Sequence, residues 1–169
     1  MFKKKRVYMD FAASTPLHMQ VKREISRGML RYGNPLASHT EGREARALVE
    51  DARLRIARTL SVKPETLYFT GSGTESNNLA EQGVVEALLL KGVKPESLHI
   101  ITSDFEHASS TNVFKYWEKR GVQVSYAKPD REGFITAEEV IKHIRPETIL
   151  VSIVAVQSEI GQIQPIKEI

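Results

Sequence analysis

The 169-residue sequence contains no cysteine. This absence excludes disulfide bonds, thiolate metal sites and a cysteine nucleophile from these residues. The sequence also has little excess of either sign of charge, because 24 lysines and arginines are nearly balanced by 21 aspartates and glutamates. Such a balance gives no argument for a nucleic-acid partner. No apolar run is long enough for a membrane span, and Asp10 interrupts the apolar residues near the N-terminus. We therefore expect a cytoplasmic protein with no membrane association.

We interpret the two clusters of basic residues as solvent-exposed. Residues 3–6 form a Lys-Lys-Lys-Arg block, which we expect to be a solvated tail. Five arginines between residues 43 and 58 alternate with Glu44, Glu50 and Asp51, so a solvated helix face is a better interpretation than a nucleic-acid surface. No pair of histidines shows metal-ligand spacing with a carboxylate, so we expect no metal site.

The hydrophobic residues make up 41% of the chain, enough for a buried core, and they alternate between strand and helix periodicity. We expect strands at residues 7–11, 66–69, 98–102, 122–126 and 148–156. We expect helices at residues 16–32, capped by Thr15, and at 41–60, 79–88, 113–121 and 136–145. This alternation predicts an α/β fold, a three-layer sandwich with a mostly parallel sheet. The run at 148–156 is the richest in β-branched residues, which favours a central strand.

The stretch 70–78, Thr-Gly-Ser-Gly-Thr-Glu-Ser-Asn-Asn, joins a predicted strand to a predicted helix. Its glycines allow close approach of a ligand, and the first amides of a helix are unpaired donors, so the stretch is suited to a phosphate. An ordinary turn with Thr74 as the helix cap is the alternative. The stretch lacks the lysine of a nucleotide-binding P-loop and the dinucleotide fingerprint, which favours a phosphate on another kind of molecule.

Two further polar turns follow predicted strands, at residues 103–107 and 157–159. Ligands of parallel α/β sheets bind at the carboxyl ends of strands, so we expect these turns to lie near the stretch 70–78. His107 stands in the first of them. An imidazole there could stack on a flat aromatic ligand or transfer a proton, although a structural role is the alternative.

Five short motifs occur in the order and approximate spacing of one enzyme family. They are Asp-Phe-Ala-Ala-Ser-Thr-Pro at 10–16, Gly-Asn-Pro at 33–35, Gly-Thr-Glu-Ser-Asn-Asn at 73–78, Glu-His at 106–107 and Glu-Ile-Gly at 159–161. In these motifs the chain resembles the cysteine desulfurases, which are class V aminotransferases among the fold-type I pyridoxal-phosphate enzymes. The resemblance implies an N-terminal strand and helix at residues 1–32 and, at 33–169, an incomplete large domain of the fold-type I transferase fold.

The resemblance also implies roles for particular residues. Gly73 and Thr74 would hold the phosphate of pyridoxal 5′-phosphate, and His107 would stack over its pyridine ring and take part in proton transfer. The family commonly has an asparagine before the Glu-Ile-Gly motif that hydrogen-bonds the ring hydroxyl. Ser158 takes that position here, and its hydroxyl could donate one such bond.

The implied activity is removal of sulfur from L-cysteine, which leaves alanine and an enzyme-bound persulfide for iron–sulfur cluster assembly or tRNA thiolation. Ala12, Ala13 and Asn34 would lie near this substrate. The family is homodimeric, and a sulfur-acceptor protein would be a further partner.

The family's remaining active-site groups come later in its sequences than the position of Ile169. These are the aspartate on the pyridine nitrogen, the Schiff-base lysine, the persulfide cysteine and the arginine for the substrate carboxylate. We therefore expect the N-terminal portion of a cysteine desulfurase, either one half of a split enzyme completed by a second polypeptide or a truncated gene product. A non-catalytic remnant that serves as a binding or oligomerisation module is one alternative, and another class V enzyme, such as a selenocysteine lyase or an aminotransferase, is a second.

Overall fold

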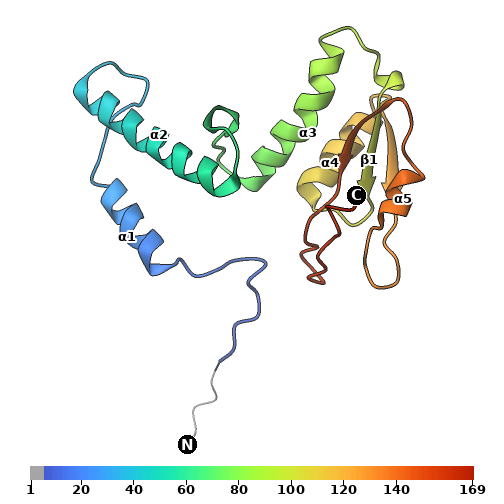
Figure 1. Ribbon diagram of the computed structural model, residues 1–169, viewed down its shortest axis with the longest axis horizontal. Helices are drawn as coiled ribbons and strands as arrows, with labels where there is room; N and C mark the ends of the chain where they lie inside the picture. The colour runs from blue at the N-terminus through green and yellow to red at the C-terminus, as the bar shows by residue number, and fades with distance from the viewer. Residues whose placement is uncertain (1–5) are drawn as a thin grey trace, which may run out of the picture. The chain divides into compact units, whose positions relative to one another are not determined.

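The computed structural model describes residues 6–169 (Figure 1). They fall into two compact units, the described residues of Met1–Phe69 and Thr70–Ile169. Each unit is described by itself. Lys3, Lys4 and Lys5 of the predicted basic tail lie outside the described residues. The domain boundary expected between residues 32 and 33 stays a prediction. None of the helices in residues 6–169 combines the length and the apolar character needed to cross a bilayer.

The first unit contains two helices, α1 (Met19–Gly28) and α2 (Thr40–Leu60). Helix α2 confirms the prediction, but α1 is shorter than expected at both ends. It begins after His18, whose Nδ1 accepts a hydrogen bond from the Gln20 amide, and not at Pro16 with Thr15 as cap. Gly42 and Ala57 are the only buried residues described in this unit. The apolar stripe of α1 is therefore exposed.

Two strands predicted in the first unit are wrong. Residues 7–11 form no strand, because no other described segment pairs with them. Thr66 ends a short 3₁₀ helix, η1 (Pro64–Thr66), and residues 67–69, which follow it, pair with no described strand. They are held to α2 instead, because the Arg53 guanidinium donates to the carbonyl of Leu67 and lies 4.9 Å from the Phe69 ring centroid. β-Prone side chains alone cannot make a strand without a partner ladder.

The second unit is a parallel sheet of three strands, β1 (His99–Ser103), β2 (Gln123–Ala127) and β3 (Thr148–Ser152), in the order β2-β1-β3. The predicted α/β class with a parallel sheet is therefore confirmed. The expectation that 148–156 is the central strand is wrong, because β1 occupies the centre and is buried along its whole length. A β-branched run shows that a strand is apolar but does not show how many neighbours it has.

The helices of this unit lie on both faces of the sheet. Helices α3 (Gly73–Leu89) and α4 (Ala108–Glu118) pack on Ile100 and its neighbours, and the larger core includes Phe114 and Trp117. Helix α5 (Ala137–Ile141) packs on the opposite face, where Ile101 meets Val140. Successive side chains of β1 point to opposite faces of the sheet, so the core is divided between the two faces. Helix α5 ends earlier than the predicted Arg145.

Candidate functional site

The first turn of α3 is capped by Ser72, so the alternative interpretation with Thr74 as the cap is wrong. The backbone of Ser72 is extended, and its Oγ accepts a hydrogen bond from the Glu75 amide at 3.1 Å. The Glu75 carboxylate in turn accepts from the Gly71 amide at 2.7 Å. This reciprocal pattern satisfies two donors at the helix entrance, as in a capping box. Thr74 thus lies inside the first turn.

Two amides at the start of α3 remain available to a ligand. In the described part of the chain, neither the amide of Gly73 nor that of Thr74 has a hydrogen-bond partner, and both residues are exposed. A Cβ atom placed at Gly73 would meet no atom within 4 Å apart from the adjoining residues and the backbone of the helix itself, so the space beside this turn is open. Free amides at the positive end of a 17-residue helix suit a phosphate group.

A cavity of about 380 Å³ lies at the carboxyl end of the sheet, between the turns that follow β1 and β3. Glu106 joins these two turns, because its Oε1 accepts from the Ser103 hydroxyl and from the Val154 amide, the latter at 2.8 Å. Burial raises the pKa of Glu106, while the two hydrogen bonds act in the opposite direction. The cavity is lined by Phe105, Glu106, His107, Ala108, Val154, Val156, Gln157, Ser158 and Glu159.

His107 caps α4 and keeps its side chain exposed at this cavity. Its Nδ1 accepts from the Ser109 amide at 3.1 Å and lies 2.8 Å from the Ser109 hydroxyl. Its Nε2 has no partner within residues 6–169. The histidine is therefore fixed through one ring nitrogen while the rest of the imidazole is open to the cavity.

The turn at 157–159 brings Ser158 to the same cavity. The Gln157 side chain folds back on this turn, where its Oε1 accepts from the amides of Glu159 and Ile160 at 2.6 and 3.0 Å. Gln157 is thereby committed to shaping the turn. Ser158 is exposed, lines the cavity, and its hydroxyl forms no hydrogen bond to any described residue.

Ala108 lies between the start of α3 and the cavity. Ala108 lines the cavity beside His107 and also a neighbouring one of about 280 Å³ that Thr74 lines. Asn78 ties the two elements together, because its Nδ2 donates to the carbonyls of Thr74 and Ser109 at 2.8 and 3.3 Å. The three polar turns predicted to converge are therefore neighbours in this unit.

The remaining predicted residues, Ala12, Ala13 and Asn34, belong to the first unit, and their role near a substrate stays a prediction. All three are exposed. The Asn34 side chain shapes its own proline-containing loop by accepting from the Leu36 amide at 2.9 Å.

Sequence reasoning missed Glu81, a buried carboxylate behind the site. The side chain lies on α3 and is 7% exposed, and its Oε1 accepts from the Ser152 hydroxyl at 3.2 Å. Burial raises the pKa of Glu81, and the nearby Glu106 carboxylate adds to this effect. The sequence contained one indication that Glu81 is buried. Residue 81 stands four positions before the core residue Val85 and so lies on the same face of the helix.

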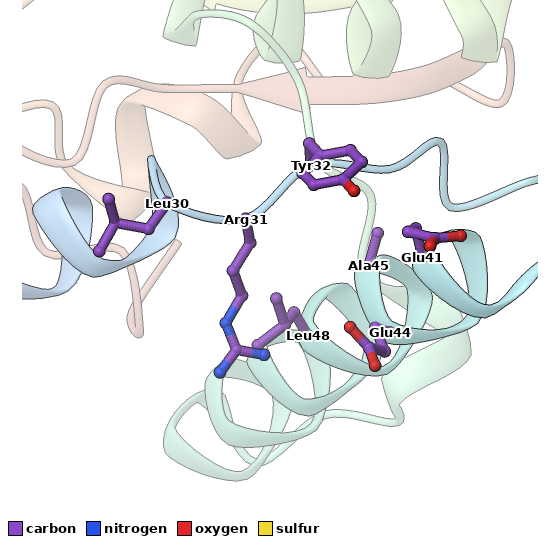
Figure 2. Close-up of a pocket in the computed structure, with 7 residues that line it drawn as sticks. All are labelled: Leu30, Arg31, Tyr32, Glu41, Glu44, Ala45 and Leu48. Atoms are coloured by element: carbon purple, nitrogen blue, oxygen red, sulfur yellow. The ribbon is translucent and has the colours of Figure 1, made fainter.

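Another cavity, of about 250 Å³, lies in the first unit between the segment after α1 and one face of α2. Figure 2 shows Tyr32 from that segment above Ala45 of α2, and the Arg31 side chain reaching down beside Leu48. None of the residues predicted to act on a ligand lines this cavity. We therefore place the candidate site at the carboxyl end of the sheet.

Comparison with known proteins shows the family of this chain. The family "Aminotransferase class-V" matches residues 7–169. A cysteine desulfurase, IscS, from Dictyoglomus turgidum is 42% identical over 168 residues, which are 98% of this chain and 41% of the relative. The chain thus spans about two fifths of the length of this curated relative.

Solved structures show the same relationship. One described as a NifS-like protein superposes with a TM-score of 0.88 at 35% identity, over 96% of this chain and 44% of that one. A second, described as SspA in complex with cysteine, gives 0.85 at 37% identity, over 95% and 45%. The match across residues 7–169 and these likenesses show that the chain belongs to the aminotransferase class-V family, whose enzymes depend on pyridoxal phosphate, and that it is a cysteine desulfurase-like member.

Proposed function

We propose that these residues form the phosphate- and ring-binding part of a pyridoxal-phosphate-dependent cysteine desulfurase. The proposal is carried by the free amides at the start of α3, where Thr74 lines a cavity next to the one that His107 and Ser158 line. Ala108 lines both cavities. A phosphate seat and an exposed imidazole next to a partly apolar cavity are what a phosphorylated aromatic ring requires.

Each residue has a separate task in this proposal. The amides of Gly73 and Thr74 bind the phosphate, the imidazole of His107 covers one face of the ring, and the hydroxyl of Ser158 donates to the ring oxygen. When bound, pyridoxal phosphate supplies the electron sink for chemistry at the amino acid. Glu106 holds the two cavity-forming turns at a fixed separation through its bonds to Ser103 and Val154.

The reacting groups have to come from outside these 169 residues. The chain has no cysteine to carry a persulfide, and no lysine lines either cavity beside the site. We propose that a second polypeptide, equivalent to the remaining three fifths of the relatives, supplies both groups. The complete enzyme would then act on L-cysteine, with Ala12, Ala13 and Asn34 near the substrate and a sulfur-acceptor protein as a further partner.

Ligand binding is the first test. Pyridoxamine 5′-phosphate is a suitable probe, because its amine cannot condense with surface lysines. We expect the chain to bind this probe and inorganic phosphate in equilibrium dialysis. We also expect Thr74→Ala to weaken the binding of both, because the Thr74 hydroxyl at this turn can donate a hydrogen bond to the phosphate in addition to the amide. If neither molecule binds the wild-type chain, a non-catalytic module becomes the better description.

Complementation is the second test. The chain is mixed with pyridoxal phosphate and with the part of the Dictyoglomus turgidum relative that lies beyond the matched region. A thiol reductant such as dithiothreitol is included, because it supplies the two electrons that release the persulfide sulfur as sulfide. We expect alanine and sulfide to form from L-cysteine only when both polypeptides are present. Formation of neither product would contradict the split-enzyme proposal. A preference for selenocysteine over cysteine, or transamination without sulfide, would instead indicate another class V activity.

A further inference from the structure

We propose that Ser109 and Asn77 are positioning residues, which fix the imidazole of His107 and join it to the first turns of α3. Asn77 Nδ2 donates to the Ser109 hydroxyl at 2.9 Å, and this hydroxyl lies 2.8 Å from His107 Nδ1. The inference deepens the proposed function, because it takes His107 as the residue that covers the ligand ring.

The direction of this hydrogen-bond chain follows from its members. The Ser109 amide donates to His107 Nδ1 at 3.1 Å, so Nδ1 is an acceptor and the neutral ring carries its proton on Nε2. The Ser109 hydroxyl must then give its own proton to Nδ1 as well. Its oxygen is left to accept from Asn77, whose Nδ2 can only donate. The amide and the hydroxyl of Ser109 thus share the one lone pair of His107 Nδ1, while the Ser109 oxygen accepts from Asn77.

The burial of Ser109 makes this arrangement hard to replace. The residue is 8% exposed, so water cannot readily supply the bonds that a variant would lose. Asn78, next to Asn77 on α3, donates to the Ser109 carbonyl at 3.3 Å and is itself held by Gln82 Nε2 at 2.8 Å. Asn77 and Asn78 of α3 thus both hydrogen-bond Ser109 of α4. These bonds hold the proposed phosphate-binding turn and His107 in a fixed relative position.

A matched pair of serines tests the proposal by ligand binding. Ser110 follows Ser109 on α4, is 5% exposed, and its hydroxyl lies 3.5 Å from Asn77 Nδ2 but makes no hydrogen bond to the His107 imidazole. Its amide donates to the His107 carbonyl at 3.0 Å, a bond that Ser110→Ala keeps. We expect Ser109→Ala to weaken the binding of pyridoxamine 5′-phosphate about fivefold, the effect of one lost hydrogen bond. The affinity for inorganic phosphate should not change, because the seat on α3 is intact. Ser110→Ala should alter neither affinity.

A second test needs no ligand. In Asn77→Asp the carboxylate can only accept, so the Ser109 hydroxyl turns to it and His107 Nδ1 loses that donor. We expect the ¹⁵N resonance of His107 Nδ1 to move in the same direction in Asn77→Asp and Ser109→Ala. It should stay in place in Ser110→Ala. The measurement uses histidine-labelled protein at about pH 8.5, where an ordinary imidazole is neutral, and His107→Gln assigns the signal.

The outcomes separate this inference from the function on which it rests. An unmoved Nδ1 resonance in both Asn77→Asp and Ser109→Ala would overturn the inference. Unchanged binding of pyridoxamine 5′-phosphate by a folded Ser109→Ala chain would also overturn it. If the wild-type chain binds no phosphate, the proposed function fails, while the resonance of His107 still decides whether Ser109 and Asn77 position the ring.

Discussion

His99 is a histidine with a purely structural environment at the centre of the sheet. It is fully buried, with Nδ1 2.8 Å from the Thr148 hydroxyl and Nε2 2.9 Å from the Ser125 hydroxyl. The Thr148 hydroxyl also accepts from the Arg145 amide at 2.8 Å, and the Ser125 hydroxyl from the Arg145 guanidinium at 3.3 Å. The His99 ring therefore links β1 to both neighbouring strands.

The charge state of His99 leads to a prediction on pH. Burial lowers the pKa of His99, and the positive charge of Arg145 and the neighbouring His143 lower it further. The unfolded histidine titrates near pH 6.5, so the stability that His99 contributes is complete above that pH and is lost as the pH falls below it. We expect the free energy of unfolding to decrease from pH 7 to pH 5, by at most about 1.4 kcal/mol per pH unit for one proton.

Urea unfolding of the wild-type chain and of His99→Gln at several pH values measures this effect. The comparison is needed because Glu81 and Glu106 act in the opposite direction. Burial raises the pKa of both carboxyls, so their contribution is complete below about pH 4.5 and is lost as the pH rises. The difference between the two proteins isolates His99. Equal pH dependence in both would contradict the assignment.

The site residues that the sequence could predict are those whose setting is local. Gly73, Thr74 and His107 stand in polar turns after apolar segments, a pattern that is visible within ten residues. Ser109 and Glu81 became visible only in the structure, because their partners lie on other elements. Asn77 is separated from Ser109 by 32 positions, and Glu81 from Ser152 by 71. A serine and a glutamate in amphipathic helices predict solvent exposure unless such partners are known.

At the scale of the element, one residue at the start of α3 has a structural role and another has the proposed binding role. Ser72 holds the Glu75 amide as cap, whereas Thr74 lies within the first turn beside a free amide. We expect Ser72→Ala to lower the free energy of unfolding by about 1 kcal/mol, the usual effect of removing a serine cap. Thr74→Ala should leave the unfolding free energy nearly unchanged. Urea denaturation followed by circular dichroism measures both, and an equal loss in Thr74→Ala would show that our assignment of the cap is wrong.

The predictions of helices and strands were right for segments whose apolar periodicity is matched by a neighbouring element. Helix α2 and the strands β1 and β2 were placed within one or two residues, since their apolar faces are matched by packing or by a ladder. The strands expected at 7–11 and 66–69 failed because a strand needs a partner that its own residues do not specify. The position of 148–152 at the edge of the sheet depends likewise on which strands lie beside it.

At the scale of the whole molecule, large apolar side chains remain uncovered in both units. Among residues 6–69, Gly42 and Ala57 alone are buried, so the apolar stripes of α1 and α2 have little core to cover them. In the second unit, β3 has a described strand on one side only. An unpaired strand edge together with exposed apolar surface promotes association with another chain.

We therefore predict that the chain self-associates at high concentration through the outer edge of β3. Val151 on this strand is 40% exposed, and a lysine there would place a charge at the edge, which opposes strand pairing. We expect light scattering to show oligomers of the wild-type chain and fewer of Val151→Lys. Ile141→Lys is the matched control, because Ile141 is 63% exposed but lies on α5, away from the edge. A monomeric wild-type chain would contradict the prediction. An equal effect of Ile141→Lys would assign the association to exposed apolar surface in general, since both lysines remove such surface but only one alters the edge.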